Sequence, residues 1–209
     1  MPRRNRVTPF GEIVATEARG LLYGNRGVLH DERGDLVRSW QGRRWIACRL
    51  EFKGRRRQLM RPGRFTELFF LDEATALAAG HRPCAECRRE DFLRFRQAWS
   101  RGSDPESIRA DAIDRSLHEE RIPSGGARRL HAARLGDLPV GSMVAEDETA
   151  WLVVSGGLVP WSPHGYGAGR AVSGTTKVWA LTPPSILDAL RAGYEPAIHP
   201  TAGLASGRP

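Results

Sequence analysis

Hydrophobic and polar residues alternate in short runs along the first third of the chain. Strand-like stretches occupy residues 12–16, 21–23, 45–52 and 67–71, and turn signals rich in Gly, Asn, Asp and Pro lie between them. Short alternating runs separated by such turns are typical of small antiparallel sheets. The pattern predicts a β-rich unit with tight hairpins in this part of the chain.

The pattern becomes helical after residue 71. Asp72 can cap a helix over 73–79, and Gly80 can end it. Apolar residues recur at helical spacing over 84–99 and again over 108–121. The second of these three helices is expected to start at or just before residue 84.

Strand-like runs return in the last third of the chain, at 142–145, 151–154, 158–161 and 177–181, followed by a short helix over 184–192. The sequence therefore predicts an α+β protein, with a small β-rich N-terminal domain containing two short helices and a β-rich C-terminal domain. The expected divisions are a basic arm at 1–8, the N-terminal domain at 9–100, a helix and linker at 101–125, the C-terminal domain at 126–200 and a frayed tail at 201–209.

Positive charge is concentrated in the first half of the chain. Residues 1–100 carry 21 Lys/Arg against 12 Asp/Glu, whereas residues 101–209 carry 11 against 12. Only Lys53 and Lys177 are lysines, so the positive groups are almost all guanidinium groups, which suit bidentate phosphate contacts. A GC-rich genome would explain the excess of arginine but not its segregation. The charge distribution therefore favours a nucleic-acid partner for the N-terminal half.

Apolar residues make up 40% of the 209 positions, which is enough for a folded core. The sequence contains no apolar run of eighteen or more residues and no apolar stretch of signal-peptide length behind the first residues. We therefore expect a cytoplasmic protein without a membrane segment.

The three cysteines predict a metal site. Cys84 and Cys87 have the C-x-x-C spacing that lets two thiolates converge on one ion, and Cys48 is the only other cysteine. Structural zinc takes four ligands, so a histidine is needed to complete the set. His30 and His81 are the local candidates. His30 can reach the three cysteines more easily than His81, because it can come from a second strand beside Cys48.

The run from Phe69 to Arg88, with its alanine-rich helix and its Gly80-His81-Arg82-Pro83-Cys84 turn, resembles the second half of the zinc domain of the Ada DNA-repair protein and its small relatives. Gly24-Asn25 followed by His30 resembles the first half. The resemblance covers about residues 23–90, and it implies a structural zinc ion. The ligands that it implies are His30, Cys48, Cys84 and Cys87, with His81 at an aromatic position. Since His30 stands where that protein has its methyl-accepting cysteine, methyl transfer is not expected.

We interpret the arginines around this unit as contacts for a nucleic-acid backbone, with DNA favoured over RNA. The predicted contacts are Arg43, Arg44, Arg55, Arg56, Arg57, Arg61, Arg82, Arg88 and Arg89. A metal-dependent nuclease or other hydrolase is the alternative, with Asp114, His118 and His131 as catalytic candidates, since Asp114 and His118 share one helix face. A third interpretation makes the C-terminal domain, with its tryptophans, a module that binds a small ligand.

Overall fold

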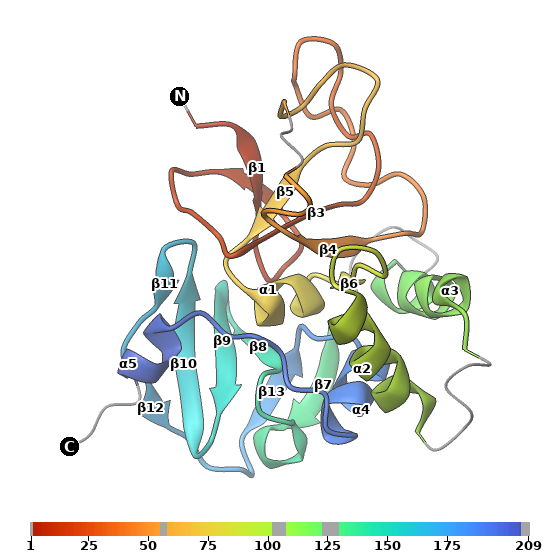
Figure 1. The fold of residues 1–209 in the computed structure, drawn as a ribbon. Coiled ribbons are helices and arrows are strands. Elements are labelled where there is room, and N and C mark those ends of the chain that lie inside the picture. The colour runs from red at the N-terminus through yellow and green to blue at the C-terminus, as the bar shows by residue number, and fades with distance from the viewer. Residues whose placement is uncertain (1, 55–57, 102–107, 123–129, 206–209) are drawn as a thin grey trace.

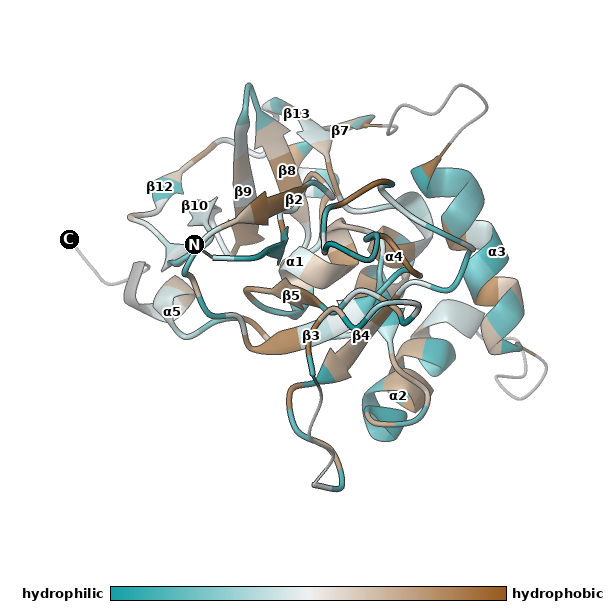
Figure 2. Cartoon of the chain, turned by 90° about the horizontal axis from the view of Figure 1, so that it is seen from above, coloured by the Kyte–Doolittle hydropathy of each residue, from teal (hydrophilic) through white to brown (hydrophobic). Residues whose placement is uncertain are grey.

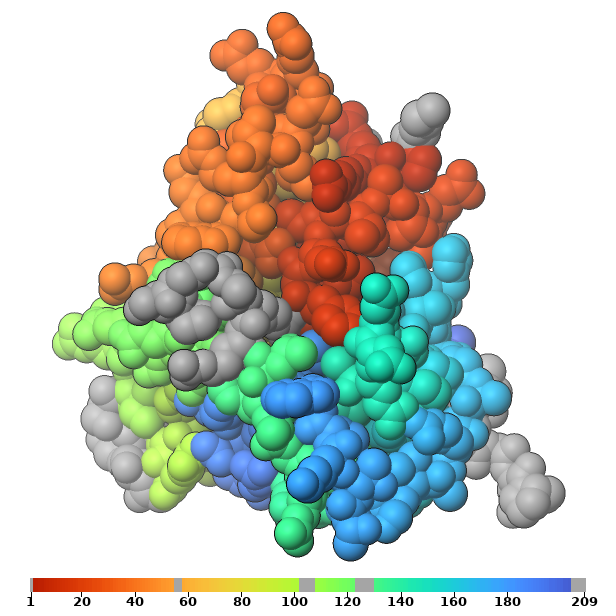
Figure 3. Space-filling view, turned by 180° about the vertical axis from the view of Figure 1, so that it is seen from behind, coloured from red at the N-terminus to blue at the C-terminus, as the bar shows by residue number. Residues whose placement is uncertain are grey.

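The computed structural model describes residues 2–54, 58–101, 108–122 and 130–205. Two sheets, one from each half of the chain, lie above and below a short central helix (Figure 1). Viewed from behind, the red-to-orange N-terminal residues gather above the cyan and blue C-terminal ones (Figure 3). The expectation of a mixed α+β fold rich in strands is confirmed.

The first sheet is built mainly from the predicted N-terminal hairpin unit. Its strands are β1 (Arg4–Val7), β2 (Ile13–Ala15), β3 (Leu22–Asn25), β4 (Ile46–Arg49), β5 (Leu68–Phe70) and β6 (Arg82–Pro83). They lie in the order β2-β1-β5-β3-β4-β6. The pairs β1–β5 and β4–β6 are parallel, and the other pairs are antiparallel. The segment expected to be a basic arm thus contributes an interior strand, β1, next to the edge strand β2.

Helix α1 (Glu73–Ala78) connects the two halves of the protein. Asp72 caps it as predicted, because its side chain accepts a 2.9 Å hydrogen bond from the amide of Thr75. Leu71, Ala74 and Ala78 pack against residues of the C-terminal sheet, whereas Ala76 and Ala79 pack against the N-terminal sheet. The small alanine side chains let both sheets approach the same helix, which explains why every residue of α1 is buried.

Three longer helices pack together at one end of the molecule. They are α2 (Arg89–Ser100), α3 (Ala110–Arg121) and α4 (Pro184–Arg191). Phe95 from α2, Leu117 from α3 and Ile186 from α4 meet in one apolar cluster. The outer face of α3 is hydrophilic (Figure 2). The helix predicted at 84–99 starts later than expected, at Arg89, because Cys84 to Arg88 form a turn before it.

The second sheet contains the C-terminal strands. They are β7 (His131–Arg134), β8 (Met143–Glu146), β9 (Thr149–Val154), β10 (Gly157–Ser162), β11 (Gly165–Tyr166), β12 (Arg170–Ala171) and β13 (Lys177–Ala180). Their order is β11-β10-β9-β8-β13-β7, with β12 paired to β10, and all these pairs are antiparallel. A 3-10 turn, η2 (Leu135–Asp137), follows β7. Helix α5 (Thr201–Ala205) lies in the segment expected to be a frayed tail.

None of the helices in the described part of the chain is long and apolar enough to cross a membrane.

Candidate metal centre and arginine-lined grooves

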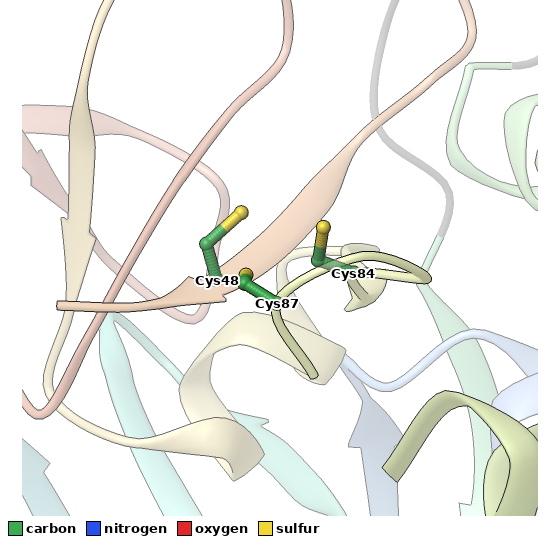
Figure 4. Close-up of side chains that lie close together, drawn as sticks. All are labelled: Cys48, Cys84 and Cys87. Carbon is green, nitrogen blue, oxygen red and sulfur yellow. The ribbon is translucent and has the colours of Figure 1, made fainter. Parts of the chain in front are cut away.

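Strand β4 and the turn before α2 bring the three cysteines together. Residues 46–47 of β4 pair with the two residues of β6 in parallel, and the amide of Cys84 continues this ladder by donating to the carbonyl oxygen of Ala47 at 2.9 Å. The ladder places Cys84 beside Cys48 (Figure 4). Cys87 returns to the same point because the amide of Arg88 bonds the carbonyl oxygen of Cys84 and closes the turn.

The sulfur atoms of Cys48, Cys84 and Cys87 all lie within 4.8 Å of one another, and all three residues are buried. Tetrahedral zinc with Zn–S bonds of about 2.3 Å would hold such atoms roughly 3.8 Å apart, so small side-chain movements would close the cluster around an ion. Three thiols without a disulfide are a donor set suited to a soft metal ion. These residues could therefore hold a metal ion.

Hydrogen bonds to the sulfur of Cys84 favour its charged thiolate form. The pKa of Cys84 is lowered, because the thiols of Cys48 and Cys87 and the backbone amides of Cys87 and Glu86 donate hydrogen bonds to its sulfur. The pKa of Cys48 is raised in turn, because it is the donor to Cys84 and Cys87 and is itself desolvated. Backbone N–H groups aimed at a sulfur atom stabilise the thiolate form, which is the form that binds metal.

Neither predicted histidine ligand belongs to the cysteine cluster among the described residues. His30 is buried elsewhere in the first half. Its Nδ1 lies 2.6 Å from the hydroxyl oxygen of Thr66, and its Nε2 lies 3.2 Å from the carbonyl oxygen of Arg61. His81 is fully buried, with its ring packed against Trp45 and Phe70. The structure brings together the three predicted cysteines and not the fourth ligand.

Two of the predicted phosphate contacts are corrected by the structure, because their side chains are buried in ion pairs. Arg82 holds both carboxylate oxygens of Asp114, at 2.9 and 2.8 Å. Arg88 is 2.8 Å from the carboxylate of Glu73 and 2.8 Å from that of Asp91. Both arginines are at most 4% exposed. Their guanidinium groups stabilise the interior and do not face a nucleic acid.

The remaining predicted contacts are exposed where they are described. Arg43 and Arg44 line a groove of about 540 Å³ together with Arg115 of α3. Asp111 and Asp114 also line it, so the groove carries both signs of charge. Arg61 and Arg89 are exposed outside this groove. Arg55, Arg56 and Arg57 lie outside the described residues.

The three catalytic candidates do not form a site. Asp114 is committed to Arg82 in the interior. His118, four residues further along α3, packs edge-on against Trp40 with a centroid distance of 4.8 Å. His131 lies at the start of β7, opposite Ala180. Within the described residues, the three do not come together in a cluster that could hold a metal ion.

Two C-terminal aromatic residues join the halves of the protein. The indole N–H of Trp161 donates to the hydroxyl of Thr75 at 3.0 Å, and the hydroxyl of Tyr166 donates to Asp72 at 2.7 Å. Both partners belong to α1 or its cap. These aromatic residues stabilise the join between the two sheets, as core residues would.

A small recess beside Trp45 was not anticipated from the sequence. Phe10, Gly11, Arg26, Ser39, Trp45, Ala79, Arg121 and Ile122 line its volume of about 90 Å³. Arg26 and Arg121 are both buried, and the Cζ atoms of their guanidinium groups lie 4.7 and 4.2 Å from the centroid of the Trp45 ring. The sequence indicates this recess only through its high arginine content. Arg26 and Arg121 lie far apart along the chain, so no local pattern links them.

Comparison with protein-family models, with curated proteins and with solved structures gives no match to this chain.

Proposed function

We propose that this chain is a zinc-containing nucleic-acid-binding protein, in which the metal is structural and arginines of the N-terminal half contact the phosphate backbone. DNA is the favoured ligand, and a role in DNA repair or processing would suit the resemblance noted above. The observation that carries the proposal is the position of β4. Cys48 lies in this strand, and Arg43 and Arg44 lie just before it, separated from it by Trp45 alone.

The metal would stabilise the arginine-bearing surface through this strand. An ion held by Cys48, Cys84 and Cys87 would tie β4 to the turn before α2, and so it would fix the point where the chain leaves the groove. Buried thiolates suit a scaffold role, because folding and metal binding are then coupled. The charge of the first half and the exposure of Arg43 and Arg44 support a contact with phosphates.

The metal assignment is tested by metal analysis and native mass spectrometry of the purified protein. We expect about one zinc ion per chain. Cys48→Ser should lose the ion, whereas the matched substitution Ser155→Ala on an exposed turn should keep it. His30→Ala and His81→Ala measure whether either histidine contributes. Protein without bound metal after purification in zinc-containing buffer would contradict the assignment.

The binding assignment is tested by fluorescence anisotropy with duplex DNA, single-stranded DNA and RNA over a range of salt concentrations. The logarithm of the binding constant should fall linearly with the logarithm of the salt concentration. The pair Arg43→Gln and Arg44→Gln should lower the salt slope by about 2, because each lost phosphate contact removes about one released counterion. Arg134→Gln, on an exposed position of β7, is the control. No affinity for any nucleic acid at low salt would refute the function.

The nuclease alternative is not carried forward, since Asp114 is held by Arg82 and the candidates His118 and His131 lie on different elements. The small-ligand alternative for the C-terminal half also loses support, because Trp161 and Tyr166 hydrogen-bond to α1 and its cap instead of lining a ligand site.

A further inference from the structure

Two buried guanidinium groups meet in the recess beside Trp45. Arg121 ends α3, and its side chain lies across Gly80, where a Cβ atom would be only 2.2 Å from Arg121 Cδ. Its N–H groups donate to the carbonyl oxygens of Leu117, Gly80, Arg43 and Asp114. Carbonyl oxygens solvate a guanidinium group, but they do not neutralise its charge.

The charge of Arg121 is destabilised by its surroundings. Burial lowers the pKa of Arg121 to about 9, and the nearby charges of Arg26 and Arg82 act in the same direction, against the opposing effects of Asp114 and Glu120. Asp114 is already held at both oxygens by Arg82. A buried positive charge in such a place is stabilised when an anion approaches it.

The recess adjoins a larger groove. The groove has a volume of about 530 Å³ and shares Gly11, Arg26 and Ser39 with the recess. Arg4 and Arg38, both exposed, line this outer part, together with one acidic residue, Glu12. A ligand entering the groove would therefore meet exposed arginines first, and buried ones at the inner end.

We propose that the recess binds a terminal phosphate group, a phosphomonoester at the end of a nucleic-acid chain, with Arg26 and Arg121 at its inner end and Arg38 at the mouth. This assignment rests on the proposed nucleic-acid function and names the part of the ligand that is recognised. A space of about 90 Å³ accepts a small anion. A phosphodiester in the middle of a strand would have to bring both neighbouring nucleosides into the same narrow space, so a chain end fits better.

The apolar walls of the recess favour the same ligand. Phe10, Trp45, Ala79 and Ile122 give the space beside the guanidinium groups apolar walls. Charge-assisted hydrogen bonds between guanidinium and phosphate are stronger in such an environment than in water. Four of the five N–H groups of Arg121 already donate to carbonyl oxygens, so Arg121 would act on the phosphate mainly through its charge. The exposed Arg38 would supply the bidentate contact, because planar guanidinium N–H groups match two phosphate oxygens at once.

The test compares oligonucleotides of one sequence that carry either a phosphate or a hydroxyl at the end. We expect the phosphorylated form to bind at least about tenfold more tightly by fluorescence anisotropy, for a 5′ or a 3′ phosphate. Arg38→Gln and Ser39→Phe should reduce this ratio, the first by removing charge and the second by filling the mouth of the recess. Both positions are exposed, so neither substitution disturbs the core. Arg33→Gln, exposed in the same loop but outside the groove, should leave the ratio unchanged.

A second arm uses inorganic phosphate alone and monitors the unfolding temperature. Millimolar phosphate should raise it more than chloride at equal ionic strength, and Ser39→Phe should remove the difference. Equal affinity for phosphorylated and unphosphorylated ends would overturn the inference, while binding of both would leave the proposed function standing. Stabilisation by phosphate without binding of any oligonucleotide would support an anion site and refute its role in binding nucleic acid.

Discussion

The hydroxyl group of Tyr166 donates a 2.7 Å hydrogen bond to the carboxylate of Asp72, across 94 positions of the sequence. The same carboxylate caps α1 and accepts a hydrogen bond from the amide of His199. Asp72 is completely buried, so its carboxylate oxygens depend on these donors in place of water. The side chain of Asp72 thus both caps the central helix and attaches the C-terminal sheet to it.

Tyr166→Phe should lower the free energy of unfolding by about 2 kcal/mol, because a buried carboxylate would lose one of its donors. Denaturation in urea measures the change. Trp179→Phe, which changes a half-exposed aromatic residue of the same sheet, is the control and should have little effect. An unchanged stability of Tyr166→Phe would mean that Asp72 does not need this hydrogen bond.

The ion pair between Arg82 and Asp114 predicts an asymmetry between single and double substitutions. Asp114→Asn should destabilise the protein by about 3 kcal/mol, because it leaves the guanidinium group of Arg82 buried without its counterion. The double variant Arg82→Met with Asp114→Leu should recover much of this loss. Asp111→Asn, exposed on the same helix, is the control. A double variant less stable than Asp114→Asn would contradict this account.

Gly80 and Gly34 offer a matched pair of backbone substitutions. Both have positive φ, +84° at Gly80 and +89° at Gly34, so alanine is strained at either position. Gly34→Ala has free space around the new Cβ and should cost about 1 kcal/mol. Gly80→Ala should cost clearly more, because its Cβ would displace the side chain of Arg121. Thermal denaturation of the two variants compares them, and equal losses would show that Arg121 moves aside freely.

His118 should make stability depend on pH. Its burial, followed by the charges of Arg121 and Arg43, lowers its pKa below the ordinary value of 6.5. The unfolded chain then binds a proton at a higher pH than the folded one, so this contribution to stability is complete above about pH 6.5 and is lost as the pH falls toward the folded pKa. NMR titration of the imidazole should give the lowered value, and Arg43→Gln should raise it. A titration at or above 6.5 in the wild type would contradict the prediction.

The elements with local signals could be predicted from the sequence. The cap at Asp72, the alanine-rich helix and the convergence of three cysteines follow from residue types at fixed spacing. Helix α2 starts later than the apolar spacing predicts, because the amides of Glu86 and Cys87 turn toward the sulfur of Cys84 instead of beginning a helix. Spacing identifies a pair of thiols, but it does not determine the backbone around them.

Long-range electrostatics could not be predicted in this way. Arg82 and Arg88 have the same side chain as the exposed arginines near them. Only the folded structure shows that Arg82 is paired with Asp114 and Arg88 with Glu73. His30 gave a similar result, since its ring contacts Thr66, 36 residues away, and not the cysteines. A charged partner that is distant in sequence can bury and pair an arginine, and the residues next to that arginine carry no sign of it.

Helix α1 packs against both sheets, so we expect that neither half unfolds while the other stays intact. Removing the C-terminal strands would expose Leu71, Ala74 and Ala78 and would strip donors from Asp72. An ion bound at the cysteines would therefore also stabilise the distant sheet through this helix. The chain should unfold as a single cooperative unit. A ligand bound in one half should therefore raise the unfolding temperature of the other half as well.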